Sequence, residues 1–161
     1  MPLDDVLVAT ALNAWKLNLD RAEKILLPLD DQQLQREVAP GKNRILYLLG
    51  HLVAVHDAML PVLGLGELLH PELADPFLTK PDRAAADLPS RTELHRCWRD
   101  VHDALNAHFA RLTPAEWLMK HTLISDADFA AHPLRNRLAV MLSRVAHINS
   151  HLGQAALALK P

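Results

Sequence analysis

The chain has 161 residues, of which 50% are hydrophobic and 22% are charged, so it predicts a globular protein and excludes a disordered one. Its 17 basic residues against 19 acidic ones give a net charge of −2 at pH 7, which argues against a nucleic-acid partner. The only cysteine is Cys97, which excludes an intramolecular disulfide and any CxxC metal or redox site. The length fits one domain over residues 1–161.

The cellular location is predicted from what the sequence lacks. No apolar run approaches the roughly 20 residues that a bilayer span needs, so we expect no membrane partner. The N-terminal segment 1–15 carries early acidic residues and no basic leader, which is unlike a signal peptide. We therefore expect a cytoplasmic protein.

The hydrophobic pattern predicts an all-α fold. Apolar residues recur at intervals of three and four, and no stretch alternates with the period of two that is typical of strands. Four long helices are expected, over residues 4–27, 43–60, 90–112 and 133–159. The natural packing of four such helices is a four-helix bundle.

Capping and breaking residues set the expected helix ends. Asp4 or Asp5 could cap the first helix, and Pro61 would stop the second. An S-x-x-E capping box at Ser90 opens the third, and Thr113 repeats that signal for a short extra helix. Pro133 suits the first position of the fourth helix.

The links between the helices indicate how the chain is connected. The link over 28–43 has room for one short helical turn, and the link HTLISDADFAAH over 121–132 is polar. The Pro-rich link over 61–89 is long enough to cross the bundle end to end, so the second and third helices could run parallel. Long links often carry function, and this one is a reasonable candidate for a pocket wall.

Two histidines on the last helix are the first candidates for metal ligands. His147 and His151 are spaced i, i+4, so they share one helix face and could bind one ion. With ten histidines in the chain, such a pair also arises readily by chance, and it could simply face solvent. The pair adjoins an apolar stripe on the same helix, formed by Leu138, Met141, Val145, Ile148, Leu152, Ala155 and Leu159.

The second helix offers the third imidazole. His51 shares a face with apolar neighbours, and Gly50 beside it would permit another helix to approach closely. A set of three imidazoles leaves coordination positions open, as in a working metal site. His56 lies about 140° from His51 around the helix and is expected at a surface boundary.

The remaining histidines and the cysteine are expected to have structural or surface roles. His95 and His102 would lie on a solvated rim of the third helix, and His108 at its edge, while His70, His121 and His132 fall in links. Cys97 has no assured base beside it and is a poor candidate for a nucleophile.

Three stretches give the sequence a resemblance to the DinB-like family of metal-binding bundles. They are APGKNRILYLLGHLVAVHD over 39–57, the Pro-rich crossover with its Leu-Thr-Pro-Ala-Glu turn over 112–116, and PLRNRLAVMLSRVAHINSHLGQ over 133–154. The HxxxHxGQ ending of the last stretch is the most specific part. The resemblance covers nearly the whole chain.

The resemblance implies a fold, a ligand set and a range of activities. The fold would be a four-helix bundle in up-down-down-up order, often as a homodimer. His51, His147 and His151 would bind one divalent transition metal, with nickel, zinc, iron or manganese all plausible. Some relatives use a low-molecular-weight thiol such as mycothiol or bacillithiol in transferase or isomerase reactions, and many others have no known activity.

A metal held by three neutral imidazoles could lower the pKa of a bound water or thiol and polarise a carbonyl. Gln154, one turn beyond His151, could orient that imidazole or contact a small-molecule substrate, or be an ordinary polar residue. Arg144 could meet an anionic substrate, although a salt bridge to a neighbouring helix is the expected role. No carboxylate is placed by spacing to act as general base, so the catalytic residues stay unassigned.

Three functions therefore remain open. The first is a metal-dependent enzyme of the thiol-transferase or hydrolase type. The second is a metal-binding stress or sensor protein without turnover. The third is a scaffold bundle in which the histidines are incidental. A substrate-sized pocket beside the open metal positions would favour the first.

Overall fold

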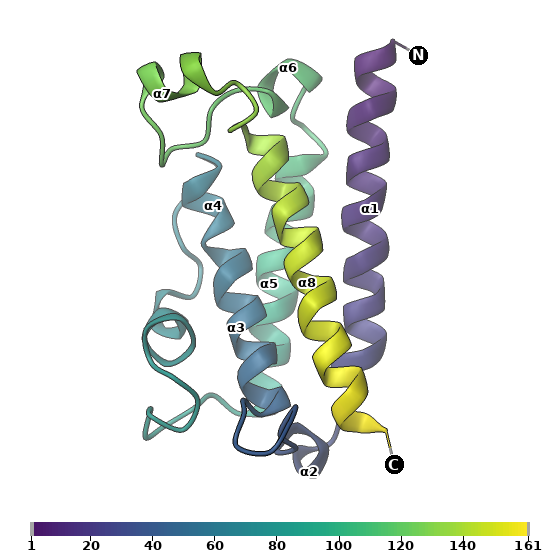
Figure 1. Cartoon of the computed structure of the whole chain (residues 1–161), viewed down its shortest axis with the longest axis vertical. Coiled ribbons are helices and arrows are strands. Elements are labelled where there is room, and N and C mark those ends of the chain that lie inside the picture. Colours follow the sequence, from purple (N-terminus) through teal and green to yellow (C-terminus); the bar gives the residue numbers. More distant parts are fainter. Residues whose placement is uncertain (1, 161) are drawn as a thin grey trace.

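The computed structural model describes residues 2–160, and over this range the chain is helical with no strand. Four long helices lie side by side, namely α1 (Leu3–Leu26), α3 (Ile45–Asp57), α5 (Arg91–Phe109) and α8 (Arg137–Leu159) (Figure 1). Four short α-helices lie in the links, namely α2 (Asp31–Leu34), α4 (Met59–Val62), α6 (Pro114–Trp117) and α7 (Asp126–Ala131). The all-α prediction is confirmed.

The helices pack around a core rich in leucine and tryptophan. Trp15 of α1, Trp98 of α5 and Trp117 of α6 are all fully buried. α1 packs against α8, and α3 lies between α5 and α8. The segment 45–62 is long and apolar enough to cross a membrane, contrary to the sequence-based expectation, but 72% of it is buried inside the fold. Such burial is typical of a core helix.

The long link over 61–89 returns along the outer side of α3 (Figure 1). It contains the 3-10 turn η1 (Pro71–Leu73) and the π-helical turn η2 (Asp75–Thr79), both in contact with α3. Phe77 of η2 is fully buried, and its ring occupies the space that a Cβ at Gly50 would need, 2.3 Å away. Gly50 thus permits the approach of an aromatic ring and not, as expected, of another helix.

Two capping predictions and one predicted short turn are confirmed. Ser90 and Thr113 each form the expected capping box. Each hydroxyl accepts from the backbone N–H of the glutamate three residues later, and that glutamate's carboxylate accepts from the backbone N–H of the capping residue. The link after α1 contains the expected short turn, α2, which Asp30 caps.

Three predictions of helix boundaries are wrong. α1 begins at Leu3, so Asp4 and Asp5 lie inside its first turn, where the helix dipole favours acids, and cap nothing. The second predicted helix divides at Ala58, and Pro61 lies within the short α4 because a first turn leaves backbone N–H groups unpaired anyway.

The fourth predicted helix also begins later than expected. Asn136 caps α8 by accepting from the N–H of Ala139 at 2.9 Å, so Pro133 precedes the helix. The link over 121–132 contains α7, which Ser125 caps.

Candidate metal centre

Three histidine side chains from two helices meet at the boundary between α3 and α8. His51 comes from α3, and His147 and His151 come from successive turns of α8. The Nε2 of His147 lies 3.2 Å from the Nε2 of His51 and 3.0 Å from that of His151. All three residues are partly buried, so the cluster lies between the core and the surface. The structure thus brings together the three histidines that the sequence singled out.

The distances between these nitrogens match those expected around a bound zinc ion. Imidazole nitrogens that bind zinc at about 2.1 Å, at angles between octahedral and tetrahedral, lie about 3.0–3.4 Å from one another. Both measured Nε2 separations fall in that range. The three rings meet edge to face, which lets the Nε2 atoms converge while the ring faces pack on their neighbours.

Hydrogen bonds fix where two of the rings carry their protons. The Nδ1 of His51 donates to the main-chain carbonyl of Phe77 at 2.9 Å, and the Nδ1 of His151 donates to Oε1 of Gln154 at 3.0 Å. A neutral imidazole carries one proton, so both residues present an Nε2 lone pair to the cluster. This second-nitrogen bonding is the arrangement that orients histidines around metals.

The remaining ring cannot satisfy both neighbours. His147 carries at most one hydrogen on Nε2 and can donate it to only one neighbour, so the Nε2 lone pair of the other neighbour is left without a hydrogen. The Nδ1 of His147 is buried without a hydrogen-bond partner. A divalent cation would accept all three lone pairs at once, and the donor set therefore fits one.

Burial favours the neutral form of two of these three imidazoles. Burial lowers the pKa of His147 to about 4, with smaller contributions from His151, His51 and Arg144. Burial also lowers the pKa of His151, although the bond to Gln154 opposes this shift. The two imidazoles are therefore unprotonated at neutral pH, as metal binding requires.

A small pocket adjoins the cluster along the same two helices. It has a volume of about 150 Å³, and its lining residues are Val55, Ala58, Met59, Val62, Leu78, Val140 and Arg144. Val55 lies one turn from His51, and Arg144 lies one turn from His147. Val62 and Leu78 belong to the 61–89 link, which thus forms part of the wall as expected.

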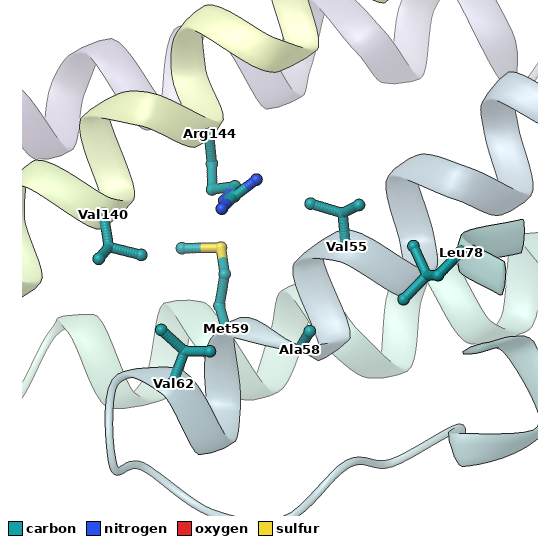
Figure 2. A pocket seen from close by; sticks show the side chains of 7 residues that line it. All are labelled: Val55, Ala58, Met59, Val62, Leu78, Val140 and Arg144. Atoms are coloured by element: carbon teal, nitrogen blue, oxygen red, sulfur yellow. The ribbon is translucent and has the colours of Figure 1, made fainter. Parts of the chain in front are cut away.

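Arg144 provides the one charged group in this pocket. Figure 2 shows its guanidinium pointing from α8 toward Val55 and Met59. Arg144 forms no ion pair within residues 2–160, so the expected salt bridge is not found. Burial lowers the pKa of this guanidinium, which nonetheless stays charged because an arginine titrates far above neutral pH.

Two histidines that the sequence assigned to the surface are buried. His56 is 0% exposed and His102 is 3% exposed, so the expected boundary and solvated rim are wrong. The Nδ1 of His56 donates to the Nε2 of His102 at 2.7 Å, and the Nδ1 of His102 donates to the carbonyl of Trp98 at 2.8 Å. The position of His56 around the helix did not predict its burial, because both faces of α3 are covered by other parts of the fold.

Cys97 is buried on α5, and burial raises the pKa of its thiol, with the carboxylates of Glu72 and Asp100 adding to the effect. A nucleophilic role is thereby disfavoured.

An all-helical protein in which three imidazoles converge one turn from a small pocket is a candidate metal-binding bundle. The sequence profile of the DinB superfamily matches residues 14–155, most of the chain. The protein therefore belongs to the DinB superfamily. No curated protein matches the sequence.

Proposed function

We propose that the protein is a divalent-metal-dependent enzyme that acts on a small molecule, of the thiol-dependent transferase or metal-assisted hydrolase type. His51, His147 and His151 would hold the metal. The observation that carries the proposal is a pocket one helical turn from three convergent imidazole nitrogens, lined by the guanidinium of Arg144, which forms no ion pair within residues 2–160. A pocket near a metal site can bind a substrate, which metal storage alone does not require.

The chain's own residues suggest how a substrate would be positioned. A divalent metal at the imidazoles would supply Lewis acidity and lower the pKa of a group brought to it. Arg144 would bind an anionic group of the substrate, because its guanidinium has no competing carboxylate. The aliphatic walls would exclude water and so strengthen that electrostatic contact.

The pocket also limits the substrate. Its volume of about 150 Å³ lies below the roughly 300–1,000 Å³ of pockets for drug-sized ligands, so it fits a small group or part of a longer molecule. A low-molecular-weight thiol could enter as co-substrate with its anionic group on Arg144. No acidic side chain lines the pocket, so no general base is assigned.

A non-catalytic metal-binding stress or sensor protein is the alternative. The small volume of the pocket and the lack of an acid within it favour this second candidate. The two functions differ in whether Arg144 affects a reaction or only the local packing.

The assembly and location remain part of the proposal. We infer one domain in the up-down-down-up order of a four-helix bundle, which is supported by the running directions of α1, α3, α5 and α8 in Figure 1. A homodimer, a cytoplasmic location and the lack of nucleic-acid and membrane partners stay predictions.

The first experiment measures metal content. Untagged protein is analysed by elemental mass spectrometry beside a His147→Ala, His151→Ala double variant. We expect a transition metal, either nickel, zinc, iron or manganese, that the double variant lacks. A wild-type protein that takes up no metal at this cluster after incubation with all four would overturn the proposal.

The second experiment separates enzyme from sensor. The loaded protein is screened with thiol co-substrates and with ester and amide substrates, beside Arg144→Gln. For an anionic substrate we expect KM to rise in the variant while its metal content is unchanged. If the protein binds metal but turns over none of these substrates, the result would favour the non-catalytic metal-binding protein instead.

A further inference from the structure

A second group of metal-ligating side chains lies on the other side of α3, where the link meets α5. His70 directly precedes η1, Glu72 lies within η1, and Cys97 lies on α5. One ligand atom from each of the three lies within 4.8 Å of the other two. The cluster shares no residue with the three-histidine centre.

The position of His70 is fixed by the backbone around it. The carboxylate of Asp57, which is only 1% exposed, accepts from the backbone N–H groups of Leu69 and His70 at 2.9 and 2.8 Å. These two bonds hold the link against the end of α3. The imidazole of His70 is thereby held against α5, and the residue is only 7% exposed.

The surroundings of this ring are rich in negative charge, and one of its two nitrogens, the Nδ1 that bonds Glu72, has a hydrogen-bond partner while the other has none within residues 2–160. Its Nδ1 lies 3.3 Å from a carboxylate oxygen of Glu72, and its Nε2 lies 3.2 Å from a carboxylate oxygen of Asp100. The Nε2 is buried and nevertheless makes no hydrogen bond, because its contact with Asp100 lacks the required geometry. A buried ring nitrogen without a bond, facing an acid, is an arrangement that a cation would satisfy.

The donor types match a borderline-soft divalent cation. An imidazole, a thiolate and carboxylates together are ligands that zinc accepts in its four-coordinate sites. Cys97 and Asp100 are spaced i, i+3, so they lie on one face of α5. The side chains of Glu72 and Asp100 are 61% and 43% exposed, which gives an ion a route from solvent.

We propose that His70, Glu72 and Cys97 form a second divalent-metal site that takes zinc or cobalt. Asp100 lies outside this set of three, and its carboxylate pairs with Arg96 at 3.2 Å. A bound ion would join η1 to α5 and so fasten the link to the bundle. The proposal does not depend on the function of the three-histidine centre.

Cobalt(II) provides a direct test, because a thiolate bound to cobalt gives a near-ultraviolet charge-transfer band that imidazole ligands do not give. Metal-stripped, full-length protein under reducing conditions is titrated with cobalt. Since Cys97 is the only cysteine, any such band reports this residue. We expect the band in wild-type protein and two bound equivalents of cobalt at saturation.

Variants separate the two sites. Cys97→Ser and His70→Gln should each lose the band and one equivalent, while the His147→Ala, His151→Ala double variant should keep the band. The equivalent retained by Cys97→Ser shows that this variant is folded. Saturated wild-type protein without a thiolate band, or a band that persists in His70→Gln, would overturn the proposal; neither outcome depends on how Cys97→Ser folds.

Discussion

Helix α3 carries two histidines five residues apart whose surroundings differ both in burial and in the placement of protons. His56 belongs to a chain of complementary bonds, in which its Nδ1–H donates to His102 and His102 in turn donates to Trp98. His51 belongs to a cluster in which nitrogens with lone pairs face one another. Both protons of the first group are hydrogen-bonded, although the Nε2 of His56 is buried without a partner, whereas the second group holds three nitrogens close enough to bind one cation. Burial alone would have ranked them the other way.

The largest expected effect separates these two groups. Removal of one imidazole in His147→Ala should weaken zinc binding by about 100-fold or more, because a structural zinc site gains roughly 3 kcal/mol per ligand. His102→Ala should leave zinc affinity unchanged but lower the free energy of unfolding. Competitive zinc titration and urea unfolding of both variants measure the two effects. Equal losses of zinc affinity in both variants would contradict the distinction.

The close approach at Gly50 gives the next largest effect. In Gly50→Ala the new methyl group would meet the buried ring of Phe77, so we expect a loss of about 1–3 kcal/mol in the free energy of unfolding. The carbonyl of Phe77 would move with its ring and release His51, which should also weaken metal binding.

A matched control for this variant lies on α8. Gly153 has nothing within 4 Å of its would-be Cβ, so Gly153→Ala should be neutral or stabilise by up to about 1 kcal/mol. Thermal unfolding of both variants makes the comparison. A Gly50→Ala variant as stable as Gly153→Ala would show that Phe77 moves freely.

The buried pair should make the protein sensitive to acid. Burial lowers the pKa of His102 to about 3, below its ordinary value of 6.5. Between these values the unfolded chain binds a proton that the folded chain excludes, so stability falls as pH falls from 6.5 toward 3. This one histidine should remove about 2 kcal/mol of unfolding free energy between pH 7 and about pH 5.

His102→Gln isolates that contribution, because glutamine does not titrate. Urea unfolding at both pH values should show a smaller acid loss in the variant than in the metal-stripped wild type. The same loss in both would show that His102 takes up its proton without unfolding.

The smallest effect concerns the orientation of one ligand. Gln154→Ala removes the acceptor from Nδ1 of His151, and the lower end of the effects known for such partners is about tenfold in metal affinity. Gln154→Glu keeps an acceptor and should retain or increase affinity. Isothermal titration with zinc compares the three proteins. If the alanine variant binds as tightly as the wild type, Gln154 does not orient the ring.

The sequence was sufficient for the cluster of three histidines but not for its surroundings. His147 and His151 share a face whenever their segment is helical, and the apolar neighbours of His51 indicated it as the third ligand before the resemblance implied the same residue. The positions of the Phe77 carbonyl and the Arg144 guanidinium depend on how the 61–89 link and α8 pack. The periodicity of the sequence carries no information on that packing.

The errors at helix ends arose where two local signals competed. Pro133 is a good first residue of a helix, but Asn136 caps α8 more effectively because its side chain bonds the Ala139 N–H. Asp57 suggested a surface position for its neighbour His56. Its carboxylate is instead buried, since it accepts two backbone N–H groups of the returning link.

The bond from His51 to the carbonyl of Phe77 joins the ligand cluster to a segment 26 residues away in the chain. Suppose a ligand binds His51 more tightly when this bond is formed than when it is broken. By thermodynamic linkage, that ligand must also stabilise η2 against local opening. Amide hydrogens of the 75–80 segment should therefore exchange more slowly in loaded protein than in stripped protein. A metal bound at the three-histidine cluster could then be detected as slower hydrogen exchange, or slower proteolysis, in the 61–89 link.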